Sequence, residues 1–181
     1  MKFYRLNDNA VIPTFATEYS ACFDLRASLI PSNVITAYSP DNQKLNISIE
    51  TNSNHEGKLL IQPFFRYLIP TDLIVDIDIG YELKVYPRSG LALKSGLVLG
   101  NQTGVIDADY VDPLYIMLMN ISTDCFIIYN KDRVAQAQLV SLVKSRNLLE
   151  TLIKPQKKSS RNGGLGSTGI SNEVGRNKVE F

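Results

Sequence analysis

The sequence predicts an all-β domain, a sandwich or barrel built from many short strands. Apolar and polar residues alternate with period two in several segments, and clusters of turn residues separate these segments. A helical period is confined to Leu91–Lys94, which indicates one or two turns of helix. With 181 residues, 44% of them hydrophobic and 20% charged, the chain has the composition of one globular domain with a sizeable core.

The expected strands follow one another through the first three quarters of the chain. Three of them alternate apolar and polar residues, namely Lys44–Ile49, Val75–Ile79 and Tyr81–Tyr86. Leu114–Met119 is apolar throughout, which predicts a strand that is buried on both faces. Cys125–Tyr129 is rich in the aromatic and β-branched residues that favour strands.

A polar turn, Asn101–Gly104, lies between the apolar runs Leu97–Leu99 and Val105–Ile106. We expect a hairpin whose turn presents backbone N–H and C=O groups to a ligand, because its asparagine and its glycine tolerate a positive φ. Asp107 leaves the second strand, and Tyr110 follows. A carboxylate in this position could activate a water next to a bound base. The alternative is an ordinary hairpin with solvated aspartates.

Three other segments carry residues that suit phosphate or metal chemistry. Pro87–Ala92 places an arginine, a hydroxyl and a glycine at the start of the expected helix, which is a phosphate-binding set or an ordinary turn. Asp24 lies between apolar residues, where it could approach a hydrated Mg²⁺ or pair with an arginine. Arg133–Gln136 alternates, which would put Arg133 and Ala135 on one face of a strand.

A C-terminal segment extends beyond the expected barrel. We place the barrel domain at residues 1–153 and a C-terminal arm at residues 154–181. The arm is cationic and then glycine-rich, which is typical of a flexible tail or of a lid whose amides close on an anion.

Composition narrows the function classes. The net charge of +1 argues against a stable nucleic-acid partner or a membrane surface, and no apolar run is long enough to span a bilayer. Two cysteines make no disulfide framework, so we expect reduced thiols in a cytoplasmic protein. A single histidine argues against a His-based metal site or a Ser-His-Asp triad.

Five short segments resemble, in order, the five motifs of the trimeric-type deoxyuridine triphosphatase (dUTPase) family. They are Ala21–Leu25, Pro87–Ala92, Gly104–Tyr110 with Asn101 before it, Arg133–Gln136 and Gly163–Gly169. The resemblance implies a jelly-roll-like β-barrel and a homotrimer with three sites at subunit interfaces. It also implies Mg²⁺-dependent hydrolysis of dUTP to dUMP and pyrophosphate, which limits uracil in DNA and supplies dUMP for thymidylate synthesis.

The resemblance implies a role for each matching residue. Asp107 would orient and deprotonate the attacking water. Tyr110 would pack under the deoxyribose and exclude a 2′-hydroxyl. Asp24 would hold Mg²⁺ through water. The other substrate contacts would come from Arg88, Ser89, Gly90, Asn101, Gly104, Val105, Ile106, Gln136, Arg161, Leu165, Gly166 and Ser167.

The chain departs from the family pattern at several positions. Cys22 stands in place of a glycine in the first motif, and Asp112–Pro113 replaces a Gly-acid pair after the third. Because a proline cannot donate a ladder hydrogen bond, we expect a strand edge or bulge there. Leu165 stands in place of a phenylalanine that would stack on uracil, a contribution of roughly 1 kcal/mol. The spacing after Arg161 is one residue short, and the chain continues past Gly169. The stretch from about residue 37 to residue 69 is longer than the family needs, and we expect an inserted hairpin there that carries the loop of His55.

Two alternatives remain at this stage. One is a dCTP deaminase, or a combined deaminase and diphosphatase, on the same barrel. The other is a regulatory dUTPase homologue that binds a protein partner through the insertion.

Overall fold

The computed structural model describes residues 1–143, 149–156, 158 and 160, and its first compact unit is Met1–Lys144. This unit ends earlier than the boundary expected at Ile153. Its elements are β1 (Lys2–Arg5), β2 (Phe23–Arg26), β3 (Val34–Tyr38), β4 (Lys44–Ser48), β5 (Glu50–Thr51), β6 (Gly57–Ile61), β7 (Arg66–Pro70), β8 (Leu73–Asp76), β9 (Tyr81–Tyr86), α1 (Ser89–Ser95), β10 (Leu97–Leu99), β11 (Gly104–Ile106), β12 (Tyr115–Asn120), β13 (Phe126–Tyr129) and β14 (Arg133–Ser141).

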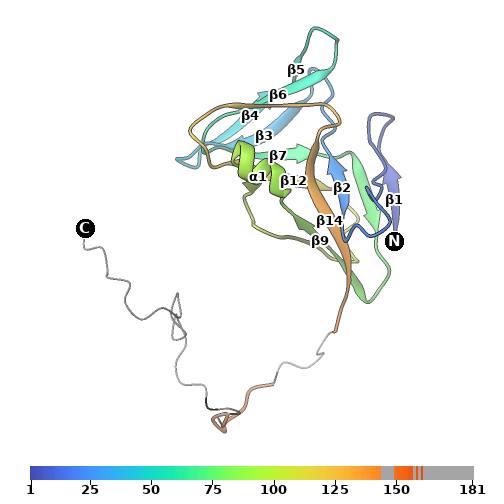
Figure 1. The fold of residues 1–181 in the computed structure, drawn as a ribbon, viewed down its shortest axis with the longest axis vertical. Helices are drawn as coiled ribbons and strands as arrows, with labels where there is room; N and C mark the ends of the chain where they lie inside the picture. Colours follow the sequence, from blue (N-terminus) through green and yellow to red (C-terminus); the bar gives the residue numbers. More distant parts are fainter. Residues whose placement is uncertain (144–148, 157, 159, 161–181) are drawn as a thin grey trace, which may run out of the picture. The chain divides into compact units, whose positions relative to one another are not determined.

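The strands form four antiparallel sheets, which confirms the all-β prediction (Figure 1). The two larger sheets have the strand orders β10-β12-β7-β3-β4 and β11-β9-β14-β2. Two smaller sheets pair β13-β6-β5 and β1-β8. Buried side chains from both larger sheets, such as Leu25, Leu83, Ile69 and Ile116, belong to one core cluster. No helix in the described ranges is long and apolar enough to cross a membrane.

The segment predicted to be an inserted hairpin is mostly part of the core. Its first part is a hairpin, because β3 pairs with β4. However, β7 lies between β12 and β3, and β6 lies between β13 and β5. Their side chains Leu59, Ile61, Tyr67 and Ile69 are buried. The prediction of an inserted hairpin over 37–69 is therefore wrong for β6 and β7, whereas β4, β5 and the turns beside them are largely exposed.

The strand predicted to be buried on both faces, β12, is buried on only one. Ile116 and Leu118 are each 1% exposed, whereas Tyr115 and Met117 are 43% and 40% exposed. Period-two alternation sends the first pair into the core and the second pair to the outer face. Within the described part of the chain, nothing covers that outer face. The prediction of burial on both faces, which was made from the apolar composition of this strand, is therefore wrong.

The two strands predicted as a hairpin form, but they do not pair with each other. β10 pairs with β12, and β11 pairs with β9, so the turn between them connects two different sheets. The turn itself is present, because the Gln102 N–H donates to the Leu99 carbonyl at 3.0 Å. The positive φ belongs to Gln102, at 63°, and not to Asn101 or Gly104. The predicted pairing of these two strands is wrong because sequence spacing does not distinguish a hairpin, whose strands pair, from a turn that connects two sheets.

The alternation predicted at the start of β14 is interrupted. The pairing with β2 shifts register between Arg133 and Ala135, which is the signature of a bulge. Val134 and Ala135 are both buried, while Arg133 is exposed. The prediction that Arg133 and Ala135 share a face is therefore wrong.

Candidate active site

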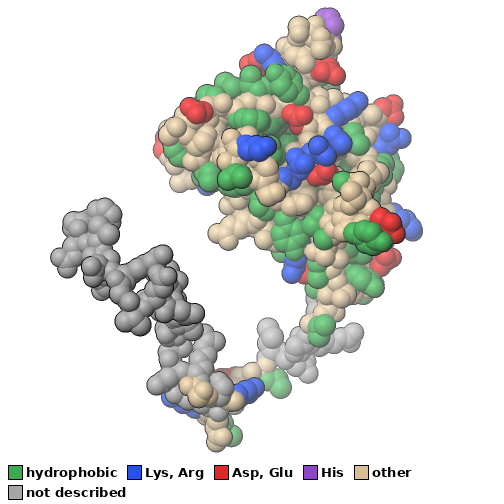
Figure 2. All heavy atoms as spheres, in the orientation of Figure 1, with side chains coloured by type: hydrophobic (Ala, Val, Ile, Leu, Met, Phe, Trp, Pro, Cys, Tyr) green, Lys and Arg blue, Asp and Glu red, His purple; other side chains and the backbone are tan. Residues whose placement is uncertain are grey.

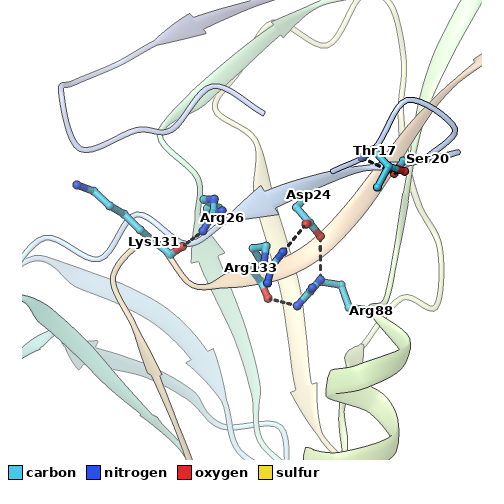
Figure 3. Close-up of polar contacts among 7 residues, drawn as sticks. All are labelled: Thr17, Ser20, Asp24, Arg26, Arg88, Lys131 and Arg133. Carbon is cyan, nitrogen blue, oxygen red and sulfur yellow. Dashed lines mark hydrogen bonds and ion pairs between the residues drawn. The ribbon is translucent and has the colours of Figure 1, made fainter. Parts of the chain in front are cut away.

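The structure brings the first, second and fourth motifs together around Asp24. Asp24 accepts a hydrogen bond from Arg88 Nε at 2.8 Å and another from Arg133 Nη1 at 3.4 Å (Figure 3). Gln136 lies opposite Asp24 on one side of β14 and opposite Tyr86 on the other. Sheet pairing of β2, β14 and β9 therefore gathers side chains that are more than a hundred residues apart in the chain.

The backbone at the start of α1 is held at this cluster. Gln136 Nε2 donates to the Pro87 carbonyl at 2.9 Å, and Arg88 Nη1 donates to the Arg133 carbonyl at 3.2 Å. Arg88 is the N-cap residue in an extended conformation, and no side chain caps the helix. A Cβ added at Gly90 would meet no atom within 4 Å, so the space above the first turn is open. Backbone N–H groups at a helix start suit an anion here.

Arg133 belongs to this cluster, although its sequence position alone did not indicate a role for it. Its guanidinium and that of Arg88 share the single Asp24 carboxylate. Two cations around one anion leave one excess positive charge, which favours a polyanionic ligand. A sequence signal existed in the arginine at the first position of the fourth motif, but only the ion pair in the structure shows that it faces Asp24.

The third motif lines a separate small cavity of about 70 Å³. Its walls come from the third-motif turn and strand and from β9 and β12, with Asn101, Gly104, Val85, Ile116 and Met117 among them. A Cβ added at Gly104 would lie 3.2 Å from Val85 Cβ and 3.5 Å from Asn101 Nδ2. A side chain here would therefore press on Val85, and glycine is favoured by this close packing and not by a positive φ.

β11 is an edge strand, which leaves one row of its backbone groups unpaired within the described ranges. An edge presents alternating N–H and C=O groups that can read the polar edge of a planar ligand. The third motif thus combines a narrow cavity with open main-chain donors and acceptors.

Asp107 and Tyr110 lie in the turn that follows β11. Asp107 is exposed, and its carbonyl accepts the Tyr110 N–H at 3.1 Å. The Tyr110 hydroxyl donates to the Pro113 carbonyl at 3.0 Å. Burial raises the pKa of Tyr110, and the nearby Asp112 raises it further, so the hydroxyl stays protonated as a donor. Pro113 precedes β12 in a loop, so the predicted strand edge or bulge at that proline is wrong.

Within one chain, Asp107 and Arg88 lie towards opposite ends of β9. Ile106 pairs with Leu83, so Asp107 follows at the level of Glu82 near the start of β9, whereas Arg88 comes two residues after its end at Tyr86. At ~3.3 Å per residue, the five steps along the chain from Leu83, the partner of Ile106, to Arg88 span at most about 17 Å. The phosphate-type cluster and the third-motif turn are therefore at opposite ends of one strand. Arg161, Leu165, Gly166 and Ser167 lie outside the described residues.

Asp24 is the acidic side chain at the cluster that was expected to approach Mg²⁺. Within the described ranges no three His, Cys, Asp or Glu side chains gather as a metal site. A single carboxylate still fits Mg²⁺, because this ion keeps several waters and takes further oxygens from substrate phosphates. Near Asp24, burial raises the pKa of the Cys22 thiol, and the Asp24 charge raises it further.

Comparison with known proteins gives one consistent result. The family model for dUTPase matches residues 56–169. The deoxyuridine 5′-triphosphate nucleotidohydrolase of Dinoroseobacter shibae is 36% identical over 163 residues, which are 90% of each chain. The relative from Treponema denticola with the same name is 34% identical over 169 residues, covering 93% of this chain and 98% of its own.

A solved structure agrees on the fold. The dUTPase of Staphylococcus bacteriophage 80alpha with dUPNHPP has a TM-score of 0.68 at 21% identity, over 93% of this chain and 98% of that one. It is described as one of the phage dUTPases that control transfer of virulence genes. This solved structure and the chain therefore share a jelly-roll-like β fold.

Proposed function

The chain belongs to the dUTPase family, and we propose that it hydrolyses dUTP to dUMP and pyrophosphate by attack of water on the α-phosphate. The observation that carries this proposal is the convergence of Arg88, Arg133 and Gln136 on Asp24 at the open start of α1. In a cell this reaction would limit uracil in DNA and supply dUMP for thymidylate synthesis.

The triphosphate would bind at the start of α1. Arg88, Ser89 and Gly90 would contact phosphate oxygens through a guanidinium, a hydroxyl and backbone N–H groups, and Gln136 would assist from β14. Phosphoryl transfer needs charge neutralisation and an in-line leaving group more than it needs covalent chemistry from the protein. A preorganised donor of this kind contributes on the order of 3 kcal/mol to transition-state stabilisation in other enzymes.

The third-motif cavity would take the uracil ring. Asn101 and the open edge of Gly104, Val105 and Ile106 would pair with its polar groups. Cytosine reverses two of these donors and acceptors, so buried polar atoms would stay unpaired with dCTP. Tyr110, held by its hydrogen bond to the Pro113 carbonyl, would pack under the sugar and leave no room for a 2′-hydroxyl.

Asp107 would orient the attacking water and accept its proton. General bases typically contribute ~10²–10⁴-fold to the rate. Since a carboxylate is a weak base, its positioning of the water matters as much as its proton affinity. Mg²⁺ bound to the triphosphate would neutralise its charge, and Asp24 would hold that ion through water. Arg161, Leu165, Gly166 and Ser167 of the arm are proposed to cover the bound nucleotide.

The distance of about 17 Å along β9 supports a homotrimer with sites shared between subunits. Asp107 from one subunit would meet Arg88 from another, because within one chain they lie towards opposite ends of β9. Shared sites of this kind follow from closed rotational symmetry, in which each interface repeats around the axis.

The test is pyrophosphate release from each deoxynucleoside triphosphate, with wild type compared with Asp107→Asn. We expect dUTP to be preferred, and the variant to bind dUTP but turn it over at least a hundredfold more slowly. Equal turnover by the variant would refute the assigned base. Ammonia release from dCTP would instead favour the deaminase.

A protein-binding role is the second candidate function, because the phage neighbour is described as controlling transfer of virulence genes. The exposed turn 52–56 between β5 and β6 is the part of residues 37–69 that could engage a partner without disturbing the core. Replacing this turn by Asn-Gly should leave dUTP turnover intact. Loss of turnover in that variant would tie the turn to catalysis and exclude a separate binding role.

A further inference from the structure

Met117 of β12 forms part of the wall of two cavities. One is the third-motif cavity of about 70 Å³, and the other is a cavity of about 520 Å³ on the outer face of the five-stranded sheet, where Tyr38, Arg66 and Leu68 are among its lining residues. Met117 is the residue that the two linings share. Figure 2 shows that apolar side chains reach the surface beside charged ones, so exposure alone singles out no residue. The position of Met117 between two cavities does.

The Met117 side chain packs on the start of the third-motif turn. The Gly100 N–H donates to the Met117 carbonyl at 2.8 Å, which holds the two backbone segments together. A Cβ added at Gly100 would lie 3.3 Å from Met117 Cγ and 3.4 Å from its Sδ. The thioether chain therefore lies against the residue that precedes Asn101, whose side chain is proposed to pair with uracil.

The third-motif cavity must widen to admit a pyrimidine. At ~30 Å³ per water, its volume of about 70 Å³ holds about two waters, and a pyrimidine ring with two carbonyl oxygens is several times larger than one water molecule. Val85 and Ile116 are almost fully buried, and β-branched side chains are stiff. Met117 is unbranched, flexible and 40% exposed, and it has the larger cavity on its other side. It is therefore the wall that can yield.

The part of the ring that faces this wall follows from the proposed function, on which this inference rests. If Asn101 and the edge of β11 pair with the polar groups of uracil, the carbon edge of the ring, C5 and C6, points away from them. The apolar walls that β9, β10 and β12 supply are left for that edge. A substituent at C5 would then press on Met117.

We propose that Met117 is a specificity-determining residue, whose side-chain length limits the size of the group at C5 of the bound pyrimidine. With hydrogen at C5, the side chain needs only to rotate towards the larger cavity. The 5-methyl group of dTTP would require it to leave the wall, which removes its packing on Gly100. One methylene in an apolar pocket changes kcat/KM by about 10–200-fold, so a single wall of this kind is enough to favour dUTP.

The test compares pyrophosphate release from dUTP and from dTTP, whose bases differ only by the 5-methyl group. Met117→Ala shortens the wall, so it should raise kcat/KM for dTTP relative to that for dUTP by about tenfold or more. Met117→Val keeps a residue type that favours strands and should shift the ratio in the same direction by less.

Met119→Ala is the matched control. It removes the same side chain from the same face of β12, two residues further along, and Met119 does not line the third-motif cavity. The ratio of kcat/KM values should therefore stay at that of the wild type. A relaxed ratio in Met119→Ala equal to that in Met117→Ala would overturn the assignment, because selection would then not depend on the cavity wall.

Calorimetry with dUMP and dTMP on the full chain gives a second readout that needs no turnover. Met117→Ala should bind dTMP, relative to dUMP, about tenfold more tightly than the wild type does. Melting temperatures establish which of the two Met117 variants is as stable as Met119→Ala. An unchanged preference for dUMP and for dUTP in a variant of that stability would overturn the role of Met117.

Failure of this role and failure of the proposed function give different results. A chain whose preference for dUMP over dTMP depends on Met117, but which does not hydrolyse dUTP, would refute the proposed function and leave the role of Met117 standing. A chain that hydrolyses dUTP, and whose Met117→Ala variant rejects dTTP as well as the wild type does, would refute the role of Met117 alone.

Discussion

At Gly57 the backbone leaves no room for a side chain. A Cβ added there would lie 1.9 Å from the Leu29 carbonyl oxygen, which is a backbone atom and cannot rotate away. We expect Gly57→Ala to lower the free energy of unfolding by about 3 kcal/mol, at the upper end of overpacking costs. Urea denaturation measures this.

Gly90→Ala is the matched control for stability, because a Cβ there meets nothing within 4 Å and the residue lies in α1. It should leave the free energy of unfolding unchanged or raise it by up to ~1 kcal/mol, since alanine favours a helix. Equal stability of the two variants would contradict the close approach at Gly57.

Cys22 reports on the electrostatics of the Asp24 cluster. Burial, and then the Asp24 charge, raise the pKa of this thiol, so less thiolate is present near neutral pH. Only the thiolate reacts with iodoacetamide. We therefore expect Cys22 to be alkylated more slowly than the exposed Cys125 at pH 7.5, with a rate that is still rising as the pH passes 9.

The variant Asp24→Asn isolates the contribution of the Asp24 charge to the pKa of Cys22. Removing the carboxylate lowers the pKa of Cys22, so its alkylation should become faster while that of Cys125 stays the same. Mass spectrometry of the two peptides gives both rates from one sample. Unchanged labelling of Cys22 in this variant would mean that Asp24 does not act on the thiol.

At the scale of elements, a substitution in β7 distinguishes a core strand from part of an inserted hairpin. Ile69 is fully buried in β7, which pairs with both β12 and β3. Ile69→Ala should cost about 2–5 kcal/mol of stability, as large-to-small core substitutions do. Replacing the exposed turn 52–56 by Asn-Gly should change stability by less than ~1 kcal/mol. Thermal unfolding measures the stability that each variant loses. Similar small losses in both variants would mean that β7 belongs to an inserted hairpin and not to the core.

Local sequence patterns predicted most of the strands, but they did not predict which strands pair with each other. The alternation in Tyr81–Tyr86 matches β9, and the helical residues near Leu91 match α1. In contrast, the turn after Leu99 gave no indication that β10 and β11 join different sheets. Pairing depends on contacts between distant residues, and a local pattern holds no information about those.

Over the whole molecule, the candidate site was predicted in its residues but not in its geometry. Asp24, Arg88 and Gln136 were named from motifs, and the structure brings them together. The sequence did not predict that Arg133 pairs with Asp24. The orientation of Arg133 follows from the bulge between Arg133 and Ala135, which no sequence pattern indicated. The separation of Asp107 from Arg88 is likewise a consequence of register along β9.

That separation leads to a prediction about assembly. If Asp107 of one subunit acts with Arg88 of another, two inactive variants can restore each other. Asp107→Asn and Arg88→Ala should each lose nearly all dUTP turnover. After they are unfolded together and refolded as a one-to-one mixture, about a quarter of the shared sites would pair an intact Asp107 with an intact Arg88 in a symmetric trimer. Pyrophosphate release by the mixture should recover to a similar fraction of the wild-type rate.

The control is the same two variants refolded separately and then mixed without subunit exchange, which should stay inactive. Light scattering on both samples establishes that each is a trimer. A mixture that refolds to a trimer and remains inactive would show that Asp107 and Arg88 must come from one chain. The pairing of β9 with β11 would then have to change on substrate binding, because it places these two residues towards opposite ends of β9.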